Sequence, residues 1–344
     1  MEVQELEDPV LTEHLSNIAA DGMDVFLLKE GTVRGALLHG TTLVNQMRRN
    51  HELGILETLL LGHSYIAAGL LTAQMKSLDR LAITIDTDGP ADGVSVESNV
   101  HGEVRGYLKN PAIPVEGPVE SFDLSPYLGS GILAVTRFPQ GARHPYTGQV
   151  ELNYRSIAKD LAHYFLVSEQ TPTAFDLSVQ FDREGRVVGA GGLLLQRLPD
   201  SAETDVTGLE QAISGVPSLG AEFAAGATPA SLIRAHFGAL GADIVGSRTV
   251  EFSCSCSKGR FARFIEGMSS TQIRDMIDSG PFPLRTTCWY CNSTYDFTRE
   301  EAESIYRRRK HREETGDVSP EEGAQTGGSP DDDEGPDDGL VFEF

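Results

Sequence analysis

The chemistry in this sequence is concentrated in four cysteines that lie within 38 consecutive positions of a 344-residue chain. One pair has the spacing C-x-C in SCSCSKGR, the other has the spacing C-x-x-C in TTCWYCNS, and 31 residues separate them: Cys254, Cys256, Cys288 and Cys291. A C-x-x-C on a tight turn directs two thiolates at one tetrahedral ion, and a second pair completes a four-sulfur site. We expect these residues to bind one structural Zn²⁺ per chain, in preference to an iron–sulfur cluster, which usually has other spacings.

The same spacing gives each cysteine a close neighbour in the chain. Two cysteines in a C-x-C or a C-x-x-C can be oxidised to a local disulfide when their Cα atoms lie within about 7 Å. Zinc holds thiols as thiolates, the form that oxidants attack, and oxidation would release the metal. Because metal binding supplies much of the folding free energy of a small zinc domain, that domain would then unfold. The spacing therefore fits both a static zinc ribbon and a metal site that acts as a switch.

The charge of the chain is negative and unevenly distributed. The formal net charge is −23, and residues 313–344 contain twelve Asp or Glu and no Lys or Arg. Subtracting these twelve from 51 acidic residues leaves 39 against 28 Lys and Arg, a net charge of −11 on residues 1–312. Domains that neutralise phosphates usually carry a basic surplus, so this composition argues against a nucleic-acid partner.

The sequence also bears on where the protein works. The stretch MEVQELEDPV is acidic and lacks the basic and apolar regions of a secretion signal. The longest apolar stretch, residues 53–75, is interrupted by Glu57, His63 and Gln74, and its spacing predicts a helix with mixed faces rather than a membrane span. We expect a cytoplasmic protein without membrane association, where paired cysteines are more often metal ligands or redox centres than structural disulfides.

The elements that must position the cysteines follow from hydrophobic periodicity. Residues 23–199 combine helical patterns at 53–75 and 156–170 with alternating strand patterns, one pair of which flanks the turn DTDGPADG. We expect an α+β core domain with one large mixed sheet. The glycines of VVGAGGLLLQ do not fit G-x-G-x-x-G, so they indicate a glycine bulge in a strand rather than a phosphate loop.

Three further segments follow this N-terminal core domain. Residues 200–249 are rich in Gly, Ala, Ser and Thr and lack strand patterns; they predict a metastable helical linker, because each glycine in a helix costs about 0.5 to 1 kcal/mol. Residues 250–299 form the predicted small zinc domain, in which we expect Trp289 to pack. Residues 300–344 predict a charged helix, with RRRKHR as a solvated face that pairs with the tail, and then a disordered acidic tail.

Several motifs occur in one order along the chain. They are DGPADG, VRGYL, YFLVSEQTPT and GAGGLLLQRLP, followed by TVEFSCSCS and CNSTYDF around the cysteines. With the four cysteines, this set resembles the heat-shock-protein-33 family, the 33 kDa chaperonins, over about residues 23–299. The resemblance implies a redox-regulated holdase, which is a chaperone that binds unfolding proteins without ATP and is not an enzyme.

The resemblance also implies roles for the cysteines. In the reduced state all four bind zinc; in the oxidised state Cys254 pairs with Cys256 and Cys288 with Cys291. The zinc then leaves, residues 250–299 act as a redox-switch domain that unfolds with the linker, and apolar surface becomes available to unfolded or misfolding client proteins. The active, oxidised form is expected to be a homodimer that can hand clients over to ATP-dependent foldase chaperones.

Two features depart from the family pattern, and two other functions stay open. The linker is richer in Gly and Ala, and the acidic tail is an extension that we expect to keep the oxidised protein soluble. The main alternative is a static zinc-ribbon module that binds nucleic acid or protein, although few basic residues lie near the cysteines. A thiol oxidoreductase using Cys288 and Cys291 would place its C-x-x-C at a helix start and needs no second pair.

Overall fold

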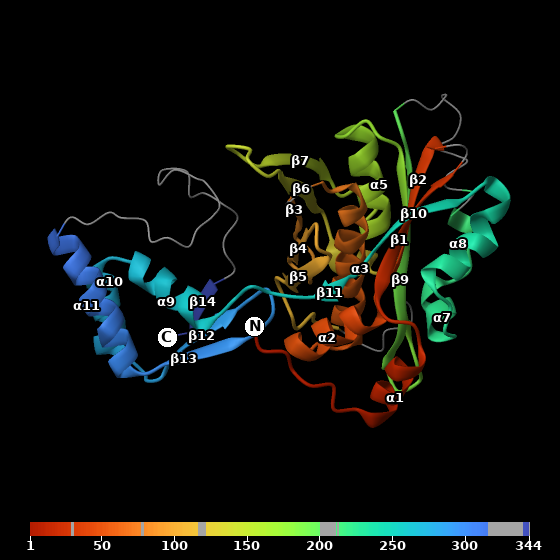
Figure 1. The fold of residues 1–344 in the computed structure, drawn as a ribbon. Coiled ribbons are helices and arrows are strands. Elements are labelled where there is room, and N and C mark those ends of the chain that lie inside the picture. Colours follow the sequence, from red (N-terminus) through yellow and green to blue (C-terminus); the bar gives the residue numbers. More distant parts are fainter. Residues whose placement is uncertain are drawn as a thin grey trace. The chain divides into compact units, whose positions relative to one another are not determined.

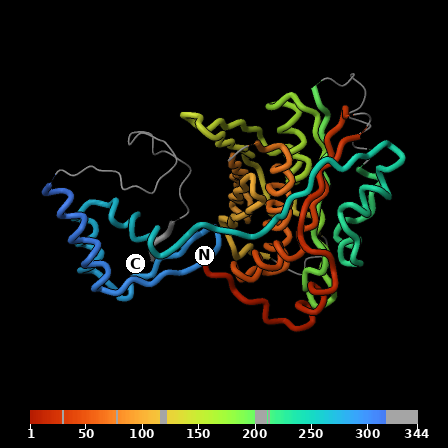
Figure 2. Tube along the Cα trace, viewed as in Figure 1, coloured from red at the N-terminus to blue at the C-terminus, as the bar shows by residue number. Residues whose placement is uncertain are grey.

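The computed structural model describes residues 1–28, 31–76, 79–115, 122–199, 211, 213–315 and 340–343 (Figure 1, Figure 2). The chain divides into a larger unit, Gln4–Ser253, and a smaller unit made of Met1–Val3 and Cys254–Phe344. Both units contain helices and strands, so the predicted α+β class is confirmed.

The larger unit contains two sheets where the sequence analysis predicted one. The five-stranded antiparallel sheet has the order β10-β1-β2-β9-β8, with bounds β1 Gly22–Leu28, β2 Val33–His39, β8 Thr173–Phe181, β9 Val187–Arg197 and β10 Asp243–Arg248. The six-stranded sheet has the order β11-β5-β4-β3-β6-β7, with bounds β3 Arg80–Thr87, β4 Gly93–Asn99, β5 Glu103–Leu108, β6 Gly131–Phe138, β7 Tyr146–Glu151 and β11 Glu251–Phe252. Only the β11–β5 pair is parallel among these described strands, so the second sheet is mixed.

One helix explains why the strands form two sheets. Helix α3 (Ile55–Leu71), continued by the 3₁₀ turn η2 (Thr72–Gln74), packs on β2, β8 and β9 of one sheet and on β3, β4 and β5 of the other. Among the described residues, Ile55–Gln74 is the stretch long and apolar enough to cross a membrane, and 83% of its most apolar window is buried inside the protein. A helix between two sheets must be apolar nearly all round, which accounts for its hydropathy.

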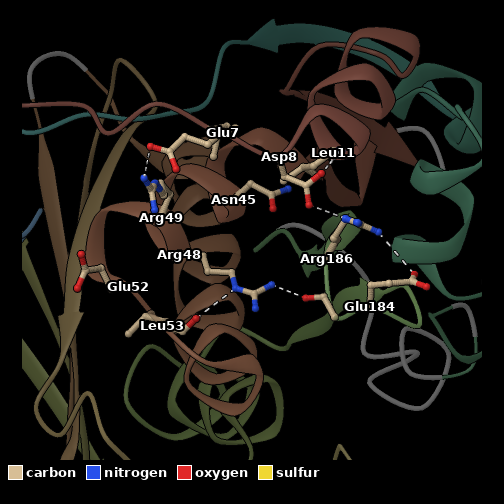
Figure 3. Close-up of a pocket in the computed structure, with 12 residues that line it drawn as sticks. Glu7, Asp8, Leu11, Asn45, Arg48, Arg49, Glu52, Leu53, Glu184 and Arg186 are labelled. Carbon is tan, nitrogen blue, oxygen red and sulfur yellow. Dashed lines mark hydrogen bonds and ion pairs between the residues drawn. The ribbon is translucent and has the colours of Figure 1, made fainter.

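The other described helices of the larger unit pack around α3 and the two sheets. They are α1 Pro9–Asn17, α2 Thr41–His51, α4 Ser125–Leu128, α5 Ile157–Val167, α7 Leu219–Ala224, α8 Pro229–Phe237 and the 3₁₀ turn η3 Gly238–Leu240. Helix α5 contacts β8 of one sheet and β6 and β7 of the other. Helix α1 begins at Asp8, whose carboxylate accepts hydrogen bonds from the backbone of Val10 and Leu11 and pairs with Arg186 at 2.6 Å (Figure 3). An acidic N-cap satisfies amides that the first turn of a helix leaves unpaired.

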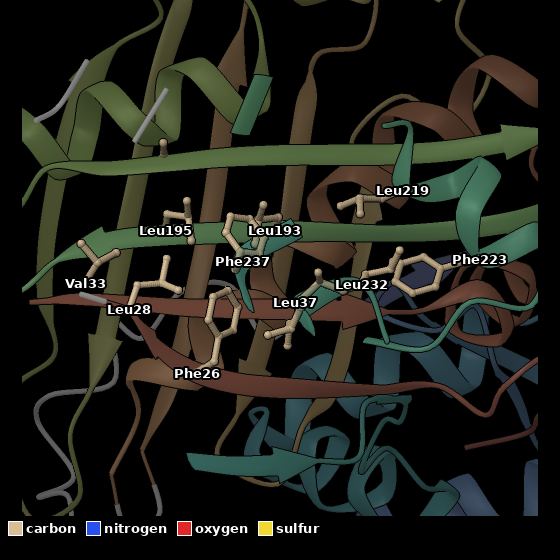
Figure 4. Close-up of a cluster of buried hydrophobic side chains, with 12 residues drawn as sticks. Phe26, Leu28, Val33, Leu37, Leu193, Leu195, Leu219, Phe223, Leu232 and Phe237 are labelled. Atoms are coloured by element: carbon tan, nitrogen blue, oxygen red, sulfur yellow. The ribbon is translucent and has the colours of Figure 1, made fainter. Parts of the chain in front are cut away.

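The predicted linker is part of the larger unit, where its apolar side chains cover one face of the five-stranded sheet. Leu219 and Phe223 of α7 and Leu232, Ile233 and Phe237 of α8 form one buried cluster with side chains of β1, β2 and β9 (Figure 4). Each such side chain contributes about 1.5 to 3 kcal/mol when it is fully buried. Helical structure in this segment therefore depends on the sheet beneath it.

Residues 243–248 correct the expectation that the linker contains no strand. They form β10, which pairs with β1 from Met23↔Arg248 to Leu27↔Asp243, with an irregularity between Val25 and Phe26. The run DIVGSR is short and contains a glycine, so periodicity alone did not distinguish it from the surrounding helical segment.

The glycines of β9 lie in a strand, as predicted, and they allow a close contact with α7. A Cβ atom on Gly189 would lie 1.9 Å from the Gly220 carbonyl oxygen, and one on Gly191 would lie 2.2 Å from the Phe223 ring. The pairing of β8 with β9 changes register beside Gly189, which is the predicted bulge. The motif therefore serves helix–sheet packing.

The described residues of the smaller unit form three helices and a three-stranded sheet. The helices are α9 Lys258–Gly267, α10 Ser270–Ser279 and α11 Arg299–Thr315, and the strands, in the order β13-β12-β14, are β12 Leu284–Cys288, β13 Thr294–Phe297 and β14 Leu340–Glu343. Strand β14 lies in the segment predicted to be a disordered tail and corrects that prediction for residues 340–343. Its sequence LVFE has high strand propensity and pairs along the edge of β12. Residues 316–339, the rest of the predicted tail, lie outside the described residues.

The basic run on α11 has partners within the smaller unit. Arg308 and Arg312 contact the Glu266 carboxylate of α9 at 2.9 and 3.3 Å, and Arg309 contacts Glu313 at 3.0 Å. The Glu266 side chain is only 8% exposed, so this pair joins α9 to α11. Arg308 and Arg312 are 50% and 36% exposed, as expected of a solvated face, but they pair with Glu266 of α9, whereas the tail was the expected partner.

Candidate metal centre

Two local structures bring the four cysteines together. Cys254 and Cys256 lie in the extended segment before α9, whose N-cap Ser257 accepts a hydrogen bond from the amide of Arg260. Cys288 ends β12, and the turn after it is closed by hydrogen bonds from the amides of Cys291 and Asn292 to the Cys288 carbonyl, at 3.3 and 2.7 Å. Asn292 adopts a left-handed backbone conformation with φ of 56°, which asparagine tolerates better than most residues. The C-x-x-C is thus on a tight turn.

The four sulfur atoms form one compact, buried group. All four Sγ atoms lie within 4.8 Å of one another, and every one of these side chains is a buried free thiol. The Sγ–Sγ distances are 3.8 Å between Cys254 and Cys288 and 3.3 Å between Cys256 and Cys291. With Zn–S bonds of about 2.3 Å, the sulfur atoms of a tetrahedral site lie about 3.8 Å apart. The cluster therefore has the size and donor type of a four-thiolate metal site.

The electrostatics of the cluster also favour a bound cation. The thiol of Cys254 raises the pKa of Cys256, but hydrogen bonds from Cys288 and Cys291 outweigh this effect and lower that pKa to about 6. The pKa values of Cys288 and Cys291 are raised by hydrogen bonding with Cys254 and Cys256, together with burial. The protein alone thus favours the thiolate of Cys256 and opposes ionisation of Cys288 and Cys291, so four thiolates need a metal ion to balance their charge.

Two residues that the sequence analysis did not single out contact the cysteines. The Tyr295 hydroxyl lies 3.2 Å from the Cys256 Sγ and donates to the Cys256 carbonyl at 3.3 Å. The Ser293 hydroxyl accepts a hydrogen bond from the Cys291 Sγ at 3.2 Å. Both follow the C-x-x-C in CNSTYDF, and strand alternation directs residues 293 and 295 to one side. Such contacts orient metal ligands and adjust their affinity.

Trp289 differs from its prediction. It was expected to pack inside the small domain, but its side chain is 40% exposed in the turn between the two ligands. Tyr290, the other residue between the ligands, is buried instead, at 3% exposed.

Comparison with known proteins places a chain of this fold in a class of chaperones. Residues 21–298 match the sequence profile of the family described as Hsp33 protein, and the chain belongs to this family. This confirms the resemblance that the motifs suggested.

Individual relatives support the assignment over most of their length. The chain is 32% identical to the 33 kDa chaperonin of Halalkalibacterium halodurans over 281 residues, which cover 80% of this chain and 95% of the relative. It is 33% identical to the 33 kDa chaperonin of Geobacter sulfurreducens over 300 residues, covering 87% and 96%. The crystal structure of the 33 kDa chaperonin from Thermotoga maritima superposes with a TM-score of 0.74 at 29% identity, covering 85% of this chain and all of that chain. The protein is therefore a member of a chaperone family with the same fold.

Proposed function

We propose that this protein is a redox-regulated, ATP-independent holdase that binds unfolding proteins after its four metal-bound cysteines have been oxidised. The observation that carries the proposal is the closed group of four buried thiols, with every Sγ within 4.8 Å of the others. Each cysteine also has a second cysteine two or three positions away in the chain. This spacing serves metal binding in a structural site, and it also gives each ligand a partner for a local disulfide once the metal is lost.

In the reduced state, Cys254, Cys256, Cys288 and Cys291 would hold one Zn²⁺. The bound ion would keep all four sulfurs as thiolates and tie the segment before α9 to the β12–β13 turn. The Tyr295 and Ser293 hydroxyls lie 3.2 Å from the Cys256 and Cys291 sulfurs; toward zinc-bound thiolates they would donate hydrogen bonds and orient these ligands.

Oxidation would convert this centre into two disulfides, Cys254 with Cys256 and Cys288 with Cys291. In each step two thiolate sulfurs give two electrons to the oxidant and form one S–S bond; hypochlorous acid, with one proton taken from solvent, would be reduced to chloride and water. Disulfide sulfurs no longer carry the negative charge that binds the metal, so Zn²⁺ would be released. The contacts of 3.8 and 3.3 Å join Cys254 to Cys288 and Cys256 to Cys291, so peptide mapping of the oxidised protein is the direct test of the pairing.

Loss of the centre would free the smaller unit to unfold and allow the segment at 200–249 to leave the core. The surface hidden by α7 and α8 is the apolar face of the five-stranded sheet, with Phe26, Leu37 and Leu193 at its centre (Figure 4). A contiguous apolar face is what binds exposed apolar segments of unfolding clients. The proposal includes a homodimer in the oxidised state, a cytoplasmic location and transfer of clients to ATP-dependent foldases.

The function is tested with zinc-loaded, reduced protein treated with hypochlorite or warm peroxide. Released zinc is followed with a chromogenic chelator, and light scattering of a thermally unfolding client is measured without ATP. We expect suppression of aggregation only after zinc release. A variant with all four cysteines changed to serine, treated identically, controls for oxidation of methionines. Full activity of the reduced, zinc-bound form, or no activity after zinc loss, would refute the proposal.

A further inference from the structure

The first 17 residues of this chain lie outside the region that matches the family, which begins at residue 21. Residues 1–3 belong to the smaller unit and residues 4–17 to the larger one. The chain therefore passes between the two units at two places, once between Val3 and Gln4 and once between Ser253 and Cys254.

The first residues contact the cysteine centre directly. The nitrogen of Met1 donates a hydrogen bond to the Cys256 carbonyl at 2.9 Å. The amide of Glu2 donates to the Ser293 hydroxyl at 2.8 Å, and that hydroxyl lies 3.3 Å from the Glu2 carbonyl. Ser293 is only 2% exposed and is also the acceptor for Cys291. The chain terminus is thus bonded to the backbone of one cysteine and to the hydroxyl that orients another.

The residues that follow are held firmly by the larger unit. Glu7 pairs with Arg49 of α2 at 2.9 Å, and Asp8 pairs with Arg186 at 2.6 Å (Figure 3). Leu11 of α1 is buried. The backbone of Glu5 also accepts a hydrogen bond from Arg49, at 3.1 Å. Residues 4–17 thus have a combination of ion pairs, hydrogen bonds and apolar burial of their own.

We infer that residues 1–17 are a strap that regulates the cysteine centre: its tip, residues 1–3, is part of the centre, and its remainder is anchored on the core. This rests on the proposed opening of the centre. Opening must break the tip contacts, because Cys256, Cys291 and Ser293 move with the segments that carry them. The strap therefore slows opening, and opening releases the tip while the anchor stays in place. Ser293 is the positioning residue, because its hydroxyl contacts both Glu2 of the tip and the Cys291 ligand.

Release of the tip can be observed in the full-length protein. In the reduced, zinc-loaded state the Glu2 amide, bonded to Ser293, should exchange slowly with water in NMR saturation-transfer measurements. After oxidation it should exchange at the rate of an unstructured amide, while the Thr12 amide, bonded to the Asp8 carbonyl at 2.9 Å, stays protected. An unchanged Glu2 amide in protein whose zinc has been released would overturn the inference.

The effect on rate is tested by removing the tip. Deletion of residues 2 and 3 keeps the anchors Glu5, Glu7 and Asp8 and should raise the rate of oxidant-driven zinc release about fivefold, the effect of roughly one lost hydrogen bond. Ser293→Ala should give a similar increase and Ser293→Thr should restore most of the original rate. Ser255→Ala is the matched control, since the Ser255 side chain is exposed and contacts Arg260 instead.

Combining the deletion with Ser293→Ala distinguishes a coupled strap from two unrelated destabilisations. The double variant should release zinc little faster than Ser293→Ala alone, because both changes remove the same contact. Rates that multiply, or a deletion variant that matches the full chain, would overturn the inference. If oxidant releases zinc from none of these proteins, including the full chain, the proposed function fails instead.

Discussion

The two units of this protein differ in what keeps them folded. The larger unit is stabilised by α3 between two sheets and by α7 and α8 over an apolar sheet face, and it contains no cysteine. The described part of the smaller unit combines α9, α10, α11 and a small sheet with four buried thiols. Apolar burial does not depend on redox state, whereas metal binding by thiolates is lost when the sulfurs are oxidised. A single chain can therefore have one part that persists and one part that responds.

Removing one metal ligand should produce the largest difference in stability between the two units. Cys288→Ser leaves three thiolates, and because structural zinc contributes on the order of 10 kcal/mol to small zinc domains, we expect the metal to be lost and the smaller unit to unfold. Hydrogen exchange of β12 and β13 amides should become fast, while β3 and β4 amides remain protected. Thr287→Ser, at the neighbouring position of β12, is the control and should keep its zinc. Retained zinc in Cys288→Ser would contradict the account.

A substitution in the larger unit should expose its apolar face without any oxidation. In Gly189→Ala the new Cβ would lie 1.9 Å from the Gly220 carbonyl, so α7 must move away from β9 at a cost of about 1 to 3 kcal/mol. We expect increased binding of an apolar dye and partial holdase activity while zinc remains bound. Gly238→Ala is the matched control, because no atom lies within 4 Å of its added Cβ. If Gly189→Ala binds no more dye than Gly238→Ala, then α7 does not cover the surface proposed here.

Within the smaller unit, the ion pairs of the buried Glu266 carboxylate should matter more than pairs in which both side chains are exposed. Glu266→Gln removes the charge that Arg308 and Arg312 share between α9 and α11 and should destabilise this unit by about 1 to 3 kcal/mol. Glu314→Gln, whose carboxylate lies 3.8 Å from Lys310 in an exposed pair, should cost no more than about 0.5 kcal/mol. Thermal unfolding of the zinc-bound protein, followed by hydrogen exchange of α9, measures both. Equal effects would mean that α11 is not needed to hold α9.

The acidic tail should have the smallest effect on either unit. Residues 315–344 carry ten acidic residues, two fewer than residues 313–344, which also include Glu313 and Glu314. Their deletion should leave zinc affinity within about twofold but should increase light scattering of the oxidised protein, because less negative charge opposes association. Scattering of oxidised protein alone, with and without the tail, is the measurement. Unchanged scattering would show that solubility does not depend on this segment.

The sequence predicted local features of the fold well and long-range features less well. The turn at DTDGPADG, the helix at 53–75 and the convergence of four cysteines depend on short spacings, which periodicity and turn chemistry report directly. The division into two sheets could not be predicted because strand patterns do not reveal which strands pair. Strand β10 was not predicted because its six residues have no clear strand pattern. They are extended because they pair with β1 of the core.

The candidate site was predicted at its centre but not at its surroundings. The spacing of the cysteines predicted that all four sulfurs belong to one site, because two closely spaced pairs are typical of a metal or redox centre. Ser293 and Tyr295 are common residues in a strand, and only the folded hairpin shows that they contact Cys291 and Cys256. The contact between Glu2 and Ser293 joins residues 291 positions apart and uses backbone groups, so no residue type in the sequence reports it.

The central claim is that loss of the metal centre and gain of client binding are one event. The most direct measurement titrates the reduced, zinc-loaded protein with hypochlorite and records, on each sample, zinc released, thiols remaining and client aggregation suppressed. The account predicts that activity rises in proportion to zinc released and disappears again when dithiothreitol and zinc are restored. Activity that is already complete before zinc leaves, or that stays absent when all four thiols are oxidised, would contradict it.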